Sequence, residues 1–312
     1  MTDAAPVIYA HGLEKSFGPV QALNDLHLDI APGEVHGYLG PNGAGKSVTM
    51  RILLGLLRPD AGTVQVFGRN PWTHAVELHK RLAYVPGDVE LWPNLTGGEV
   101  IDMFLRLRGH RNRQRREELI ERFNLDPRKK ARTYSKGNRQ KVALIAALAS
   151  DVDLLLLDEP TAGLDPLMEA VFQEVISEVK AEGRSVLLSS HILAQVEALS
   201  DRISIIRNGH IVESGTLSDL RHMTRTTIEV DAVGSTDQLA EQSFIHDLRQ
   251  HGEYTSFEVD GDHVQQVMEM LTQLQIRSIQ AHPPTLEQLL MRHYGDDLAA
   301  RGVDEMITKK VS

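Results

Sequence analysis

The 312-residue sequence contains no cysteine, which excludes disulfide bonds, thiolate metal sites and cysteine nucleophiles. It also lacks a long hydrophobic run, because the longest, Val142 to Ala149, is far short of the roughly 20 residues that span a bilayer. The opening residues MTDAAP have neither the basic region nor the apolar run of a signal peptide. We therefore expect that the chain does not itself cross a membrane, and the missing cysteine fits a reducing compartment.

The sequence has no excess of positive charge. The formal net charge is -10, which argues against a general nucleic-acid binder. Hydrophobic residues make up 41% and charged residues 24%, as in an ordinary globular protein. At about 150 residues per domain, this length predicts two domains with ample cores.

Strand and helix patterns alternate over most of the chain, which predicts an α/β fold with a largely parallel sheet. Residues 88–150 are expected to be mainly helical, and Thr96 with Glu99 forms a capping box at one helix start. After Gly215 the pattern changes to that of a small α+β domain, so we place a boundary between domains 1–221 and 222–312. Strands are expected at 7–10, 25–30, 35–39, 63–67, 154–157, 185–189, 226–230, 254–259 and 276–279, and helices at 47–57, 100–107, 167–181, 191–199 and around 264–271.

A glycine-rich segment between a predicted strand and a predicted helix fits the phosphate-loop pattern G-x-x-x-x-G-K-[ST]. Glycines let backbone N–H groups approach phosphates closely, and a helix N-terminus adds a favourable dipole. Lys46 is expected to bind the outer phosphates, and the Ser47 hydroxyl is expected to bind Mg²⁺. The candidate ATP-binding residues here are Gly40, Pro41, Asn42, Gly43, Ala44, Gly45, Lys46, Ser47 and Thr49.

Two acids end the apolar run of four leucines at 154–157. A buried strand of this kind delivers its carboxylates to the edge of the sheet where open α/β folds bind ligands. Asp158 is expected to hold Mg²⁺ through water, and Glu159 is expected to polarise the attacking water as the catalytic base. The phosphate loop and these acids do not by themselves separate a kinase, a GTPase and a transporter motor.

The segment Tyr134-Ser135-Lys136-Gly137-Asn138-Arg139-Gln140 resembles the signature sequence of ABC ATPases, whose usual form begins Leu-Ser-Gly-Gly. Read alone, it is a helix capped by Ser135. The resemblance implies that Ser135, Lys136, Gly137 and Gln140 act on the ATP bound by a second subunit.

Further landmarks of the ABC ATPases follow in order, and together they cover about residues 7–217. Phe17 matches the aromatic residue that stacks on adenine, although read alone it is a core phenylalanine. Asp165, in Gly-Leu-Asp, resembles the D-loop at the dimer interface. His191 matches the switch histidine, a second catalytic residue. The resemblance implies a P-loop NTPase core of ABC type with an antiparallel β subdomain and a helical subdomain.

One position departs from the family pattern. The run Tyr84-Val85-Pro86 is usually followed by glutamine, but here Gly87 follows it. Glycine cannot ligate Mg²⁺ or orient water through a side chain, so Asp88, Glu90 or a water is expected to supply the oxygen.

The C-terminal segment 283–290, PPTLEQLL, resembles the ending of ATPase subunits from bacterial drug and antibiotic exporters. That resemblance implies a regulatory or dimer-supporting role for the second domain. Six arginines lie between Arg106 and Arg116, and Arg128-Lys129-Lys130 follows. This basic stretch could suggest nucleic-acid binding, but glutamates lie between its two groups and stacking aromatics are missing. We expect a solvated helical face near the surface that meets a membrane partner.

The sequence therefore predicts an ATP- and Mg²⁺-dependent ATPase subunit of a membrane ABC transporter, most consistent with an exporter of drugs, antibiotics or other hydrophobic compounds. Its expected partners are a polytopic membrane permease and a second ATPase subunit, identical or related, with no nucleic acid. The expected location is the cytoplasmic side of the cell membrane. The alternative is a non-transport ABC ATPase acting on nucleic acid or ribosomes.

Overall fold

The computed structural model describes residues 5–109, 112–222, 225–233, 239, 242–251, 254–260, 263–272 and 274–282. The chain divides into two compact units, residues 1–214 and 215–312. This division lies a few residues before the predicted boundary at 221/222. No helix among the described residues combines the length and the apolar character that a membrane span requires.

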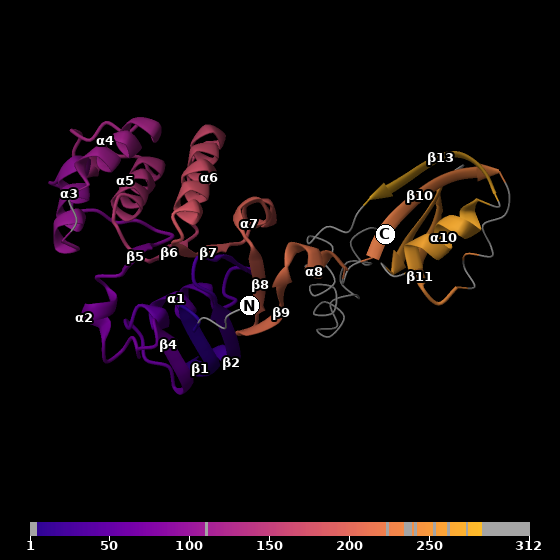
Figure 1. The fold of residues 1–312 in the computed structure, drawn as a ribbon, viewed down its shortest axis with the longest axis horizontal. Coiled ribbons are helices and arrows are strands. Elements are labelled where there is room, and N and C mark those ends of the chain that lie inside the picture. The colour runs from indigo at the N-terminus through magenta and orange to yellow at the C-terminus, as the bar shows by residue number, and fades with distance from the viewer. Residues whose placement is uncertain are drawn as a thin grey trace, which may run out of the picture. The chain divides into compact units, whose positions relative to one another are not determined.

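A six-stranded sheet forms the centre of the first unit, with strand order β5-β6-β7-β3-β8-β9 (Figure 1). The pairs β5/β6, β6/β7, β7/β3 and β3/β8 are parallel, which confirms the predicted parallel sheet. Its strands are β3 (Val35–Leu39), β5 (Leu82–Val85), β6 (Leu154–Asp158), β7 (Ser185–Ser190), β8 (Arg202–Arg207) and β9 (His210–Thr216).

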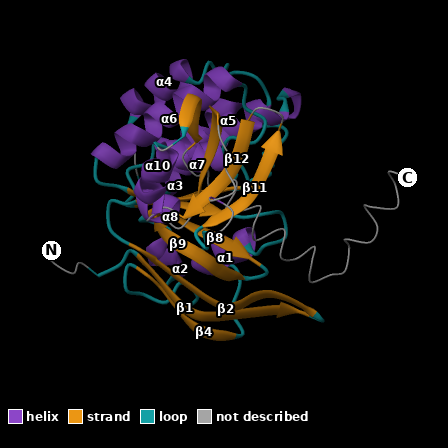
Figure 2. Ribbon diagram, turned by 90° about the vertical axis from the view of Figure 1, so that its right-hand side faces the viewer, coloured by secondary structure: helices purple, strands orange, loops and turns teal. Residues whose placement is uncertain are grey.

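A three-stranded antiparallel sheet, in the order β2-β1-β4, makes a second layer in this unit. It consists of β1 (Ile8–Phe17), β2 (Val20–Ile30) and β4 (Ala61–Val66), which lie together at the lower edge of Figure 2. Helix α1 (Lys46–Leu53) packs between the two sheets, because one buried cluster joins Met50 of α1 to Ile8 of β1 and Leu156 of β6. The helix ends four residues before the predicted end at Leu57.

The opposite face of the six-stranded sheet is covered by helices, mainly those of the predicted helical region. Leu155 and Leu157 of β6 belong to this second core, whereas Leu154 and Leu156 belong to the core that contains α1. Because side chains alternate along a strand, α1 and the covering helices pack on opposite faces. These helices are α3 (Gly97–Leu107), α4 (Arg113–Arg122), the 3₁₀ turn η1 (Ala131–Thr133), α5 (Lys136–Leu148) and α6 (Pro166–Ala181).

Local sequence explains where several helices begin. The Thr96 hydroxyl accepts a hydrogen bond from the Glu99 N–H, and the Thr96 N–H donates to the Glu99 carboxylate, so the predicted capping box is confirmed. Asp165 caps α6, and Pro166 occupies the first turn, where its missing N–H costs nothing. The shorter helices of the first unit are α2 (Ala75–Leu78) and α7 (Leu193–Leu199), and α8 (Leu217–His222) belongs to the second unit.

The second unit contains a four-stranded antiparallel sheet in the order β11-β12-β10-β13. Val267 and Leu271 of α10 pack against Phe257 and Ile228 of the sheet, as expected for a small α+β domain. The segment 283–290, on which the resemblance of the C-terminal ending rests, lies outside the described residues. The elements are β10 (Arg225–Val233), β11 (Ile245–His251), β12 (Tyr254–Asp260), α10 (Val264–Leu271) and β13 (Gln275–His282).

Candidate nucleotide and magnesium site

The phosphate loop connects β3 to α1 at the carboxyl edge of the six-stranded sheet. Gly45 has φ 114°, and a Cβ at this position would lie 2.8 Å from the Ala22 carbonyl oxygen. Only glycine satisfies both conditions without strain. Because the N-cap of α1 is this glycine, no side chain caps the helix. The first N–H groups of α1 are thus left to an external anion such as phosphate.

Lys46 is the cation of this loop. Its Nζ donates hydrogen bonds to the carbonyl oxygens of Gly40 at 2.6 Å and Pro41 at 3.2 Å. The same nitrogen lies 3.4 Å from Oε1 of Glu159. With 7% of its surface exposed, Lys46 places its charge inside the site rather than in solvent.

Ser47 and Asp158 form the candidate Mg²⁺ site. The Ser47 hydroxyl donates to Oδ2 of Asp158 over 2.7 Å, so the loop and the end of β6 meet at these two oxygens. A hydroxyl and a carboxylate are hard oxygen ligands, which fit Mg²⁺. No cluster of three or more His, Asp or Glu in the described part of the chain could hold a metal alone. An ion here would therefore take its remaining ligands from nucleotide phosphates and water.

Glu159 follows Asp158 in a left-handed backbone conformation, with φ 47°. This conformation costs roughly 1–2 kcal/mol for a residue with a Cβ, and it turns Glu159 away from the strand direction. His191 Nδ1 lies 2.8 Å from Oε2 of Glu159. The histidine precedes α7 rather than starting it, so the helix predicted at 191–199 begins two residues later. The acid, the histidine and Lys46 thus form one cluster.

Two other predicted ATP-binding residues have different surroundings. Phe17 ends β1 and is 48% exposed, so its ring is available to stack on a ligand. Thr49 is fully buried, and its hydroxyl bonds to the Gly45 carbonyl and to Tyr38. Thr49 therefore supports the loop from within. Within the loop, Asn42 and Gly43 are exposed, whereas Ala44 is buried.

The signature segment begins α5. Ser135 caps the helix by accepting a hydrogen bond from the Asn138 N–H at 3.3 Å. Gly137 lies so close to the Gly163 carbonyl oxygen that a Cβ would approach it to 2.3 Å. The side chain of Lys136 also lies beside Gly163. Gln140 is buried and donates to the Pro160 carbonyl at 3.1 Å, while exposed Asp165 caps α6.

The predicted site residues therefore form two separate groups. Lys46, Ser47, Asp158, Glu159 and His191 meet at the carboxyl edge of the sheet. The signature residues of α5 contact the 160–163 turn instead, and α5 packs on the face opposite to α1 (Figure 1). Within one chain, the signature helix and the phosphate loop belong to opposite faces of the sheet.

Gly87, where the family usually has glutamine, lies against the acid pair. A Cβ there would be 3.3 Å from the Asp158 carbonyl oxygen and 3.4 Å from Cβ of Glu159. Asp88 and Glu90, the expected substitutes, are both exposed. Nearby, burial and, second, the charge of Asp158 raise the pKa of Tyr84 to about 12, which keeps its hydroxyl protonated at neutral pH.

The arginine-rich region is solvated only in part: Arg106 and Arg113 are exposed, as predicted, but other arginines form ion pairs between helices. Arg115 and Arg122 of α4 are only 17% and 22% exposed at their side chains, and both pair with Glu178 of α6. Arg116 pairs with Asp102 of α3. The guanidinium groups therefore join helices to one another, a role that the sequence could not reveal because the partners are distant along the chain.

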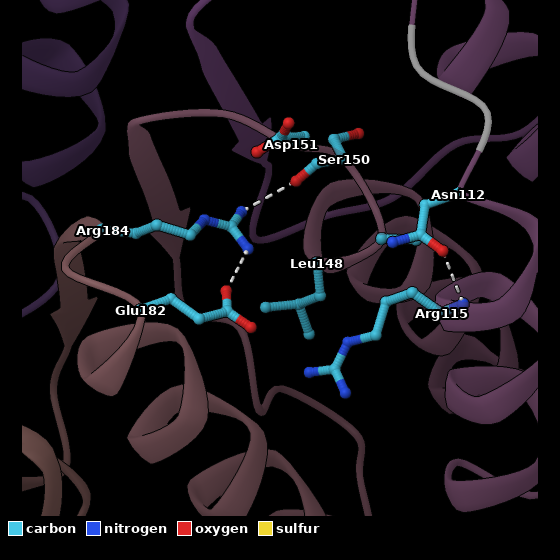
Figure 3. Close-up of a pocket in the computed structure, with 8 residues that line it drawn as sticks. Asn112, Arg115, Leu148, Ser150, Asp151, Glu182 and Arg184 are labelled. Carbon is cyan, nitrogen blue, oxygen red and sulfur yellow. Dashed lines mark hydrogen bonds and ion pairs between the residues drawn. The ribbon is translucent and has the colours of Figure 1, made fainter.

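A cavity of about 450 Å³ lies beside this network, between the start of α4, the end of α5 and the end of α6 (Figure 3). Arg184 points into it but donates to the Ser150 and Val152 carbonyl oxygens and pairs with Glu182. Burial lowers the pKa of Arg184 despite these partners. Arg115, Glu182 and Arg184, three of the charged residues that line the cavity, are thus already paired, and the cavity does not include the acid cluster.

Comparisons with known proteins agree on one family. Residues 23–162 match the family model described as ABC transporter. The chain is 39% identical over 229 residues to the daunorubicin resistance ATP-binding protein DrrA3 of Streptomyces coeruleorubidus, covering 72% of each chain. It is 31% identical to the daunorubicin/doxorubicin resistance ATP-binding protein DrrA of Streptomyces peucetius, covering 97% of each. A solved ATP-binding subunit of an ABC transporter matches with a TM-score of 0.65 and 31% identity, over 69% of this chain and 92% of that one.

Proposed function

Because the chain belongs to the family of ABC transporter ATP-binding proteins, we propose that it is the ATP-hydrolysing subunit of a membrane exporter for drugs, antibiotics or other hydrophobic compounds. The observation that carries this proposal is the meeting of Lys46, Ser47, Asp158, Glu159 and His191 at one edge of the sheet. The relatives named for daunorubicin and doxorubicin resistance support the class of cargo.

The roles of the side chains follow from their chemistry. Lys46 and the N–H groups at the start of α1 bind the phosphates of ATP, and Phe17 stacks on the base. Ser47, and Asp158 through water, would hold Mg²⁺, which would neutralise phosphate charge. Glu159 accepts a proton from the attacking water, and His191 orients the Glu159 carboxylate through their contact.

ATP-binding domains of this family dimerise and work with membrane permease subunits. In our proposal, Ser135 and Gly137 of one subunit complete the site of the other, with Asp165 at the interface. This arrangement is supported by the placement of α1 and α5 on opposite faces of the sheet. Closure of the dimer around ATP drives the permease, and the chain is bound to the cytoplasmic side of the membrane through that partner.

The proposal is tested by transport into inverted membrane vesicles that contain the permease. ATP-dependent uptake of a fluorescent anthracycline is expected with the wild-type chain and not with Glu159→Gln. Both forms should bind to the vesicles equally, because the substitution leaves the surface unchanged. Equal uptake with and without the chain would contradict the export function.

Purification provides a second test. A tagged chain isolated from detergent-solubilised membranes should carry a polytopic membrane protein with it. Recovery of ribosomes or nucleic acid in place of that protein would instead favour the non-transport alternative.

A further inference from the structure

Ser189, the fifth residue of β7, lies between the two acids of the site. Its hydroxyl donates to Oδ1 of Asp158 over 2.5 Å. The Ser189 hydroxyl oxygen also accepts a hydrogen bond from the backbone N–H of Glu159 at 3.1 Å. One hydroxyl therefore bonds both to the carboxylate of the magnesium site and to the backbone of the proposed base.

This position comes from the parallel pairing of β6 with β7, in which Asp158 is opposite Ser189. Ser189 is fully buried and Asp158 is 4% exposed, so water cannot readily replace the serine. In such surroundings a hydrogen bond to a charged group is stronger than between neutral groups, and losing it is costly.

Each carboxylate oxygen of Asp158 accepts a hydrogen bond from a different serine hydroxyl. Oδ1 accepts from Ser189, and Oδ2 accepts from Ser47 of the phosphate loop. Ser189 thus fixes the rotation of the carboxylate so that Oδ2 faces the loop. Without the serine hydroxyl, the carboxylate could rotate and Oδ1 would have no donor.

Ser189 also bears on Glu159, whose left-handed backbone conformation needs support from its surroundings. The Glu159 N–H donates both to the hydroxyl oxygen of Ser189 and, at 3.2 Å, to the backbone carbonyl oxygen of Ser189. These two bonds hold the residue where its side chain contacts Lys46 and His191.

We propose that Ser189 is a positioning residue for ATP hydrolysis, which orients Asp158 toward Mg²⁺ and holds the backbone of Glu159. This inference rests on the proposed nucleotide site and adds a residue to it. Ser189 acts through the two acids and not by contact with the nucleotide.

The test compares the affinity for a fluorescent ATP analogue with Mg²⁺ and with EDTA, in the full-length chain. Ser189→Ala should leave the affinity for the metal-free analogue unchanged, because no nucleotide contact is lost. The ratio of the affinity with Mg²⁺ to the affinity with EDTA should be about tenfold smaller in Ser189→Ala than in the wild type, as expected for the loss of one charge-assisted hydrogen bond. The kcat of the variant should fall as well. Ser189→Thr keeps the hydroxyl and should restore most of the gain.

Ser185→Ala is the matched control. Ser185 is buried on the same strand, but its hydroxyl accepts from the Gly33 N–H instead of contacting the acids. Its Mg²⁺-dependent gain should equal that of the wild type. Ser189→Cys, which keeps the shape but donates only weakly, should behave like Ser189→Ala and replaces it if the alanine variant does not fold.

An unchanged gain in folded Ser189→Ala or Ser189→Cys would overturn the inference, as would an equal loss in Ser185→Ala. A loss in folded Ser189→Thr as large as that in Ser189→Ala would do the same. If the wild type gained no affinity from Mg²⁺, the proposed function itself would be contradicted. Failure of the role proposed for Ser189 can therefore be distinguished from failure of the proposed nucleotide site.

Discussion

The ammonium nitrogen of Lys46 lies 3.4 Å from Oε1 of Glu159, so the proposed phosphate-binding cation and the proposed base form an ion pair. Lys46 also donates to two carbonyl oxygens of its own loop. An incoming phosphate must compete with these partners for the ammonium group. The binding of ATP and the release of the Glu159 carboxylate are therefore coupled through one side chain.

Glu159→Gln is expected to separate binding from chemistry. The amide keeps the shape but cannot accept the proton of water, so turnover should fall by about 100-fold or more, the scale of a lost general base. ATP should bind at least as tightly, because Lys46 loses a competing carboxylate, and an ATP-bound dimer should accumulate. Steady-state hydrolysis and size-exclusion chromatography with ATP measure both effects. Glu121→Gln, on the exposed surface of α4, is the control, and near-normal turnover in Glu159→Gln would exclude the assigned role.

Lys46→Ala is expected to weaken nucleotide binding itself, because it removes the positive charge from the phosphate loop. Titration with a fluorescent ATP analogue should show a clear loss of affinity, and hydrolysis should fall with it. Lys80→Ala removes an exposed lysine elsewhere in the unit and should change neither. If Lys46→Ala kept both affinity and hydrolysis, the phosphates would have to bind elsewhere.

The shared site is tested by mixing two inactive variants, Ser135→Arg and Lys46→Ala. In a mixed dimer, one site has both lesions and the other joins an intact phosphate loop to an intact signature. Mixed dimers should therefore occlude one ATP under non-hydrolysing conditions, and they should recover part of the activity if one site can act alone. Bound nucleotide per mixed dimer is the measurement.

A site contained within a single chain gives the opposite result for this mixture, because each subunit then carries one lesion. Wild-type dimers provide the reference for occlusion. Mixed dimers that occlude no ATP, while wild-type dimers do, would count against the shared arrangement.

Glu178→Gln is expected to loosen the contact between α4 and α6. Burial raises the pKa of Glu178, but hydrogen bonds from Arg115 and Arg122 outweigh it and lower the pKa on balance. Because the carboxylate is 41% exposed, we expect a loss of only about 1 kcal/mol at pH 7. Glu174→Gln, at a site 70% exposed with a single longer contact, should cost less.

The dependence on pH follows from the direction of this shift. A carboxyl group whose pKa is lowered in the folded state stabilises the fold above its unfolded pKa, near 4.3 for glutamate. The contribution is lost as the pH falls through the folded pKa. The difference in melting temperature between wild type and Glu178→Gln should therefore shrink in acid, and a constant difference would contradict the role of the ion pair.

Local sequence predicted those elements whose signals are local. Thr96 and Glu99 cap α3 as predicted, and β3 spans Val35–Leu39 as expected. The contact of Ser189 with Asp158 was not predicted, because it depends on which strands are neighbours in the sheet. Likewise, the ion pair of Arg115 with Glu178 was not predicted, because 63 positions separate the two residues along the chain.

Other differences arise where a helix stops or a strand is short. The helix predicted from Ser47 ends at Leu53, and Gly55 then adopts a positive φ of 67° that ends the helical path. The four-residue strand β5 was not predicted from the sequence. The roles assigned to the site residues remain predictions, since sequence and geometry show proximity and not chemistry.

The position of α1 and α5 on opposite faces of the sheet has a consequence for mass action. If each working site needs two chains, the rate of a dilute preparation should vary with the square of its concentration. Doubling the protein well below the dimer dissociation constant should raise the total rate about fourfold. A permease that holds two copies side by side would replace this dependence by a fixed local concentration. The membrane partner would then determine where in the cell ATP is consumed, because an unbound chain in dilute solution rarely encounters the second subunit that completes its site.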